Sequence, residues 1–167
     1  MLSRRTIACA CAVLLALCVS ASVAGAQPTA LRLTDPLDGK AVNVTAGGDV
    51  LHVVFFATWC PPCVEELESL ADLEARWEER GYRLVLIAVR TRHDGGRLKA
   101  FQAEQRPPGR LLFDLDGSAE KALRGGSLPT HVVFDRRGQE AHRALALSEG
   151  VEETLRGLLA ARKGAER

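Results

Sequence analysis

Two cysteines separated by two prolines have the residue types and the spacing that best suit covalent chemistry in this sequence. The segment reads Cys60-Pro61-Pro62-Cys63. A disulfide stabilises a fold mainly by closing a long loop of the unfolded chain, and a bridge between such close neighbours closes almost none. A structural role therefore explains the pair poorly. We interpret it as a reactive dithiol that cycles between a disulfide and two thiols.

The other three of the five cysteines fall within residues 1–26, a segment unlike the rest of the chain. Two arginines near its start are followed by an uncharged apolar run and then by Ala24-Gly25-Ala26. Basic, apolar and small residues in this order predict a secretory signal peptide that is cleaved after Ala26. Residues 27–167 would then form one domain, in which Cys60 and Cys63 are the remaining cysteines.

Two other fates of the N-terminal segment stay open. Residues 6–26 are long enough to remain as a membrane anchor. A lipoprotein signal ending at Cys18 is the second alternative, although Leu17 is larger than the residue that normally precedes a lipidated cysteine. In each case we expect an exported protein in a periplasmic or other extracytoplasmic compartment, where the surroundings are oxidising.

The amino-acid composition excludes some classes of function but does not identify one. The 167 residues suit one domain, and 47% hydrophobic with 26% charged residues is ordinary for a globular protein. A formal net charge of +1 gives no basic surface of the kind that binds nucleic acid. We expect no nucleic-acid partner and a monomeric chain.

The elements around the cysteines predict how they are positioned. Val50–Ala57 is an uncharged run rich in β-branched and aromatic residues, typical of a central strand buried on both faces. Apolar residues then recur at helical spacing from Pro62 to near Gly81. Tyr82–Val89 reads as a second buried strand. This order predicts a parallel βαβ unit with a right-handed crossover, in which Cys60 lies at the start of the helix.

The flanking segments complete an α/β domain with a central mixed sheet flanked by helices. Further strands are expected at Leu31–Leu33, Lys40–Val44, Arg110–Phe113, Leu128–Asp135 and Glu140–Leu147, and further helices at Arg97–Gln105, Ser118–Leu123 and Val151–Arg162. A turn at Arg136-Arg137-Gly138 joins the last two strands into an antiparallel hairpin.

These motifs resemble the TlpA/ResA-like branch of the thioredoxin superfamily. The segment 55–63, Phe-Phe-Ala-Thr-Trp-Cys-Pro-Pro-Cys, is similar to the active-site strand and loop of that branch. Leu128-Pro129-Thr130, followed by a strand and turn, is similar to its cis-proline loop, and the stretch between leaves room for a central insertion. The resemblance covers residues 31–160. It implies a thioredoxin-like fold and an exported protein disulfide reductase.

The resemblance also implies protein partners, both a donor of electrons and substrates that accept them. It implies no cofactor other than the Cys60–Cys63 disulfide. Electrons would come from a membrane thiol-disulfide donor and pass to exported protein thiols and disulfides, as in cytochrome c or copper-site maturation. Two positions depart from the pattern. Glu68 replaces a proline that often kinks the active-site helix of the branch, and Val54 replaces the aspartate that thioredoxin proper buries behind its disulfide.

Three residues are predicted to carry the catalysis. Cys60, at the helix start, is the nucleophile, because unpaired N–H groups and the helix dipole favour a thiolate there. Cys63 lies one turn further in and resolves the mixed disulfide. Glu66 lies three residues beyond Cys63, on the same helix face, and corresponds to the glutamate that assists proton movement in the branch. The alternative is that Glu66 only belongs to an acidic first turn.

Six further residues are predicted to contact the substrate: Trp59, Pro61, Pro62, Leu128, Pro129 and Thr130. By the resemblance, Leu128–Pro129 is a cis peptide bond, and its loop pairs with an extended substrate beside the disulfide. Trp59 flanks the disulfide and is suited to packing against a partner protein, with core packing as the alternative.

Other functions are weighed against the reductase. A Cu(I) metallochaperone would use Cys60, Cys63 and His131, since thiolates suit Cu(I), but a histidine in a strand is more often simply packed. No metal site is expected, because zinc needs more ligands than this cysteine pair supplies. A general dithiol oxidase would run the same chemistry in the other direction. A thioredoxin-fold peroxidase is disfavoured, because Ala57 occupies the position where that class has a threonine.

Overall fold

The computed structural model describes residues 30–89 and 95–160, so the predicted signal segment lies outside the described residues. The strands are β1 (Leu31–Thr34), β2 (Ala41–Val44), β3 (Val50–Phe56), β4 (Tyr82–Ala88), β5 (Arg110–Phe113), β6 (Thr130–Phe134) and β7 (Glu140–Ala144). The helices are α2 (Pro61–Glu65), α3 (Leu67–Trp77), α4 (Gly95–Gln105), α5 (Ser118–Leu123) and α6 (Glu149–Ala160), with a 3₁₀ turn η1 (Glu78–Arg80). Within these two ranges, no helix is long and apolar enough to cross a membrane.

The strands form one mixed sheet with the order β2-β1-β5-β4-β3-β6-β7. Strands β3, β4 and β5 run parallel, whereas the pairs on either side of them are antiparallel. Parallel neighbours need a crossover connection, which α2 and α3 supply between β3 and β4, and α4 supplies between β4 and β5. The predicted α/β class, with a mixed central sheet flanked by helices, is confirmed.

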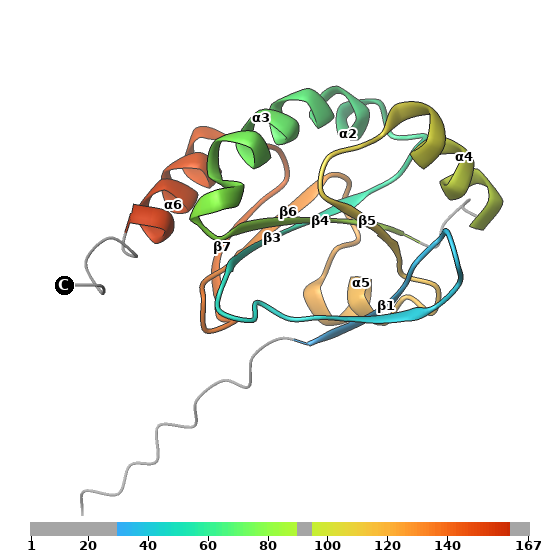
Figure 1. Ribbon diagram of the computed structural model, residues 1–167, viewed down its shortest axis with the longest axis horizontal. Helices are drawn as coiled ribbons and strands as arrows, with labels where there is room; N and C mark the ends of the chain where they lie inside the picture. The colour runs from blue at the N-terminus through green and yellow to red at the C-terminus, as the bar shows by residue number, and fades with distance from the viewer. Residues whose placement is uncertain (1–29, 90–94, 161–167) are drawn as a thin grey trace, which may run out of the picture.

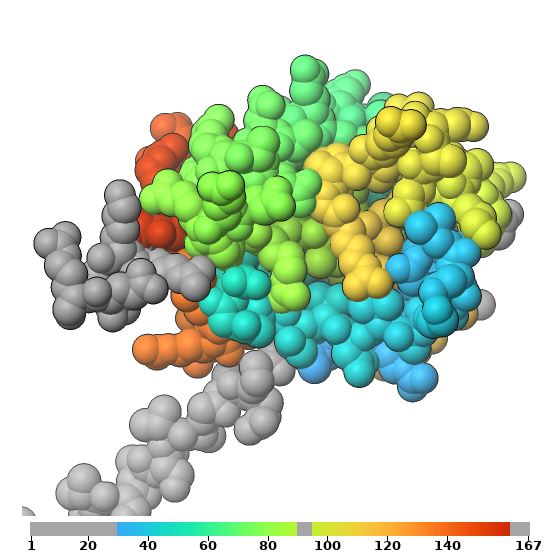
Figure 2. Space-filling view, viewed as in Figure 1, coloured from blue at the N-terminus to red at the C-terminus, as the bar shows by residue number. Residues whose placement is uncertain are grey.

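Helices cover both faces of the sheet. In Figure 1, α2, α3, α4 and α6 lie on one side and α5 on the other. The two crossovers step across the sheet in the same direction, so right-handed connections place their helices on the same face. Figure 2 shows α3 and α4 covering this side of the molecule, with the segment that leads into β5 between them.

The centre of the sheet is the core of the protein. All seven residues of β3 and all five of β6 are buried. An uncharged run of apolar residues suits a strand that has helices on both faces. Two polar side chains nevertheless have no exposed surface here, His52 on β3 and His131 on β6. Each needs a hydrogen-bond partner to offset the cost of its burial.

The active-site helix differs from the single helix expected between Pro62 and Gly81. It is interrupted at Glu66, which separates α2 from α3, and it finishes as a 3₁₀ turn closed by Gly81 in the left-handed region, at φ 82°. The interruption occurs without the proline that Glu68 replaces.

The other predicted elements are confirmed, with boundaries that differ by up to three residues; the predicted end of the last helix, at Arg162, lies outside the described residues. Strand β6 begins at Thr130 rather than at Leu128, because Pro129 has no N–H to donate to a ladder. Strand β7 ends at Ala144 rather than at Leu147. Leu147, which was predicted to end this strand, donates its N–H to a carboxylate oxygen of Glu66.

Candidate active site

The two cysteines form a disulfide at the point where β3 passes into α2. Their Cα atoms lie 5.3 Å apart. Cys60 is the N-cap residue of α2, with Pro61 and Pro62 in the first turn. Cys60 is 6% exposed and Cys63 is 2% exposed. The slightly more exposed cysteine is therefore the one predicted to attack, and the less exposed one is the one predicted to resolve.

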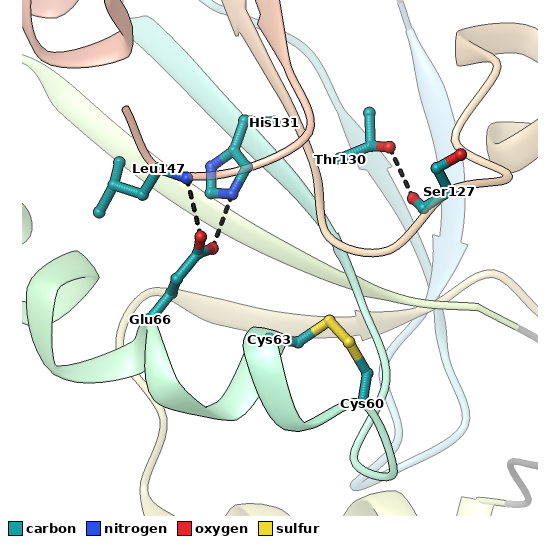
Figure 3. The surroundings of a disulfide bond; sticks show 7 residues. All are labelled: Cys60, Cys63, Glu66, Ser127, Thr130, His131 and Leu147. Carbon is teal, nitrogen blue, oxygen red and sulfur yellow. Dashed lines mark hydrogen bonds and ion pairs between the residues drawn. A yellow bond between two sulfur atoms is a disulfide. The ribbon is translucent and has the colours of Figure 1, made fainter. Parts of the chain in front are cut away.

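The loop before β6 lies across from the disulfide. The Leu128–Pro129 bond is cis, as predicted. Thr130 pairs with Phe55 in the antiparallel ladder of β6 and β3, so Pro129 lies at the end of the sheet where the active-site loop begins. The Thr130 hydroxyl donates to the Ser127 carbonyl over 2.6 Å, which fixes the loop seen opposite the sulfurs in Figure 3. Pro129 and Thr130 are buried, and Leu128 packs against the core.

An apolar surface surrounds Cys60. Trp59 is 42% exposed and Val64 is 36% exposed, and both prolines between the cysteines are exposed. The exposure of Trp59 favours the interpretation of this side chain as a contact for a partner protein over that of a core residue. Exposed apolar side chains therefore flank Cys60 on both sides in the sequence.

Glu66 occupies the break between α2 and α3, and its side chain is 18% exposed. Its carboxylate accepts hydrogen bonds from His131 Nε2 at 2.9 Å and from the Leu147 N–H at 2.8 Å. Figure 3 shows the carboxylate directed at His131 and Leu147 rather than at the sulfurs. Burial raises the pKa of Glu66, but these two hydrogen bonds outweigh it and leave the pKa below its ordinary value.

Both ring nitrogens of His131 contact other side chains, which the sequence did not predict. Its Nε2 contacts Glu66, and its Nδ1 lies 3.1 Å from Nε2 of His52. His52 Nδ1 in turn lies 2.9 Å from the Tyr82 hydroxyl. Both ring nitrogens of His131 are thus engaged by protein groups rather than by sulfur. The sequence predicts no role for His52, although a histidine inside an uncharged, buried strand indicates that its ring has a hydrogen-bond partner.

The sequence of residues 23–158 matches the redoxin family. The chain belongs to this family. A curated relative, the thiol-disulfide oxidoreductase ResA of Oceanobacillus iheyensis, is 28% identical over 111 residues, which is 65% of this chain and 50% of that protein. The chain therefore spans about half the length of this relative. Together with the redoxin match, this similarity confirms the predicted resemblance to TlpA/ResA-like proteins of the thioredoxin superfamily.

Solved structures of similar fold include two bacterial proteins. A thiol:disulfide interchange protein of the thioredoxin family from Chlorobium tepidum matches with a TM-score of 0.62 and 26% identity, over 81% of this redoxin and 99% of that chain. A secreted disulfide oxidoreductase of Mycobacterium tuberculosis, homologous to Escherichia coli DsbE, matches with a TM-score of 0.60 and 22% identity, over 78% and 95% of the two chains. The predicted thioredoxin-like fold is confirmed.

Proposed function

We propose that this chain is an exported thiol-disulfide oxidoreductase that reduces disulfides in extracytoplasmic proteins. The observation that carries the proposal is a disulfide at the start of a helix, next to a cis-proline loop and within an exposed apolar surface. The family and the oxidoreductase names of its relatives support the same chemistry. The signal-like residues 1–26 and the secreted relative support export.

The reaction begins with the reduced protein. The Cys60 thiolate attacks one sulfur of a substrate disulfide, an S–S bond forms between Cys60 and the substrate, and the other substrate sulfur leaves as a thiolate. Trp59 and the prolines offer the surface on which the partner docks, and the backbone of Leu128 to Thr130 offers donors and acceptors for an extended segment of it.

The second step releases the substrate. Cys63 loses its proton and attacks Cys60, so that the Cys60–Cys63 disulfide forms and the second substrate sulfur leaves as a thiolate. Glu66 is our proposed acceptor of that proton, for which its carboxylate must turn away from His131 and Leu147. Two electrons have then passed from the protein to the substrate. A dithiol donor must return them, and we propose a membrane thiol-disulfide protein for this role. Cytochrome c and copper-site proteins in the course of maturation are our proposed substrates.

The two prolines support the reducing direction. Proline lacks an N–H, so Pro61 and Pro62 remove two donors from the loop that faces the Cys60 sulfur. A thiolate with fewer donors is less stable, which favours the disulfide form and hence a lower potential. Strong iodoacetamide reactivity of Cys60 in acid would contradict this argument.

The reduction potential of the Cys60–Cys63 couple tests the proposal. Purified residues 27–167 are equilibrated with dithiothreitol buffers, and a Cys60→Ser variant serves as the control without a couple. We expect a value near or below that of thioredoxin, about −270 mV. A value near that of DsbA, about −120 mV, would identify an oxidase instead. The copper alternative has no support from His131, whose ring nitrogens are both hydrogen-bonded to other side chains.

A further inference from the structure

An open groove runs along one face of α5 and continues onto the cis-proline loop. Its volume is about 560 Å³, and its lining residues are Gly117, Glu120, Lys121, Arg124, Gly126 and Ser127. The lining residues from α5 recur three or four positions apart, which is the spacing of one helix face. Gly126 and Ser127 belong to the loop that leads to Pro129, and this loop lies opposite the disulfide (Figure 3). The groove therefore begins beside the place where the partner protein is proposed to bind.

Two cationic side chains line the groove, and neither is neutralised by a neighbour. Lys121 and Arg124 are both exposed. Within residues 30–89 and 95–160, neither of them forms an ion pair. Arg143, which donates to the Leu123 carbonyl near the end of α5, is by contrast already paired with Glu140. The two lining cations thus keep their charge for a group that comes from another molecule.

One anionic side chain also lines the groove. Glu120 is half-buried, and its Oε1 lies 3.8 Å from the position that a Cβ at Gly126 would take, so its carboxylate is turned toward the loop. Two cations and one anion give the lining a formal net charge of +1. The spacing of Glu120 and Arg124 would favour an ion pair in a continuous helix. None forms here, since Arg124 ends the helix with a non-helical backbone.

Arg124 occupies a backbone position that suits glycine better than arginine. It is the C-cap of α5, with φ 51° and ψ 46°, in the left-handed region that a Cβ disfavours. The same chain uses Gly81 at the corresponding position after η1, with φ 82°. The side chain of Arg124 makes no hydrogen bond or ion pair with the part of the chain that the structure describes. The contacts of the fold therefore do not explain an arginine at this position.

We propose that Lys121 and Arg124 form a basic subsite for an aspartate or glutamate that lies a few residues from the reactive disulfide of the partner protein. The proposal rests on the proposed function. A partner segment that pairs with the backbone of Leu128 would continue along Ser127 and Gly126, where the absence of a side chain on Gly126 leaves room for it. The subsite selects substrates by charge, because it attracts an acidic segment and repels a basic one. It takes no part in the exchange of sulfurs.

The experiment compares three disulfide-linked peptide homodimers that differ in charge near the cysteine. The residues about three positions before and after the cysteine are aspartate, asparagine or lysine, within the reach of an extended chain. The rate of reduction by the reduced protein is divided by the rate of reduction by dithiothreitol, which removes differences in the intrinsic reactivity of the peptides. We expect the aspartate peptide to exceed the asparagine peptide by about threefold to fivefold, and the lysine peptide to fall below both. About 0.5 M salt should remove these differences.

Variants of the groove assign the preference to its residues. Arg124→Gly and Lys121→Gln should each lower the preference for aspartate to about twofold, and the double variant should abolish it. Arg124→Lys keeps the charge and should keep the preference, whereas Glu120→Gln removes the opposing charge and should raise it. Arg137→Gln is the matched control, because it removes one exposed cation at the other end of β6. Equal rates for the three peptides, or a preference that survives in the double variant, would overturn the subsite.

Thermal unfolding separates the proposed role of Arg124 from a role in the fold. Glycine suits the left-handed backbone, so Arg124→Gly should unfold at a Tm no more than about 3 °C below that of the wild type. A larger fall would assign the side chain to the stability of the fold and overturn its assignment to the subsite. A wild-type protein that reduces none of the three peptides would refute the proposed function. Reduction of all three at equal normalised rates would refute the subsite alone.

Discussion

Replacement of Glu66 by glutamine separates the chemistry of this residue from its contribution to the fold. Glutamine has the same shape, and its carbonyl oxygen can accept the Leu147 N–H that Glu66 now accepts at 2.8 Å. Its amide N–H₂ would then face His131 Nε2, which can accept this hydrogen bond when the His131 proton lies on Nδ1. Glu66→Gln therefore can keep both contacts while it removes the carboxylate.

The expected cost to stability follows from those contacts. Two charge-assisted bonds become neutral ones, so we expect the free energy of unfolding to fall by about 1 kcal/mol. Glu66→Leu is the contrasting variant, because it leaves the Leu147 N–H and the His131 N–H without an acceptor. At roughly 1–3 kcal/mol for each buried unsatisfied donor, that variant should lose about 2–6 kcal/mol. Urea unfolding of the oxidised proteins measures both values.

The difference in stability should also depend on pH. The folded-state pKa of Glu66 lies below its ordinary value of 4.5. A lowered pKa contributes stability that is present above the ordinary value and is lost as the pH falls through the folded-state pKa. The deficit of Glu66→Gln should therefore be complete at neutral pH and shrink as the pH falls below the ordinary value and through the folded-state pKa.

The catalytic effect should be larger than the effect on stability. Glutamine cannot take the Cys63 proton, and removal of a positioned proton acceptor costs about 100-fold or more in the step that uses it. Rapid acid quenching and mass spectrometry would follow the decay of the mixed disulfide. Mixed-disulfide formation by Cys60 should be unchanged. A folded Glu66→Gln protein that resolves its mixed disulfide at the wild-type rate would refute the assignment of Glu66 as proton acceptor.

Three further predictions concern the surface and the core. Trp59→Ala should raise KM for a protein disulfide several-fold and leave the dithiothreitol-coupled potential unchanged, because the side chain is 42% exposed; a changed potential would contradict a docking role. Gly125→Ala should lower stability by about 1–3 kcal/mol in thermal unfolding, because a Cβ there would meet the Phe55 ring at 2.5 Å. The neighbouring Gly126→Ala, with its nearest atom at 3.8 Å, is the matched control and should change little. Asp114→Ala should cost about 1–2 kcal/mol in urea unfolding, because this buried side chain accepts the Ala119 and Glu120 N–H groups in the first turn of α5; no loss of stability in Asp114→Ala would contradict this capping role.

The elements that depend on local sequence could be predicted well. Val50–Ala57 is uncharged and β-branched, and this pattern is enough to place a buried strand. Cys60 follows that strand and precedes a helical pattern, so its place at the start of a helix could be predicted too. The cis bond at Pro129 came from the family resemblance and not from residue preferences, since most bonds of this kind are trans.

The contacts that join Glu66, His131, His52 and Tyr82 could not be predicted, because they depend on pairings between distant segments. His52 and His131 are 79 residues apart, and they meet only because β3 and β6 pair with Val54 opposite His131. A shift of one residue in that register would turn one ring to the other face of the sheet. The break at Glu66 is similar, because the partner that holds its carboxylate, Leu147, lies outside the helix and beyond β7.

The prolines between the cysteines have a consequence for how the protein can change over evolution. Pro61 and Pro62 are exposed, and neither can donate a main-chain hydrogen bond. The core strands, the cis-proline loop and the buried histidines do not rely on them for hydrogen bonding. Substitutions at these two positions can therefore add donors beside the Cys60 sulfur and shift the redox equilibrium with little effect on folding. A reductant and an oxidant can thus be close neighbours in sequence on this one scaffold.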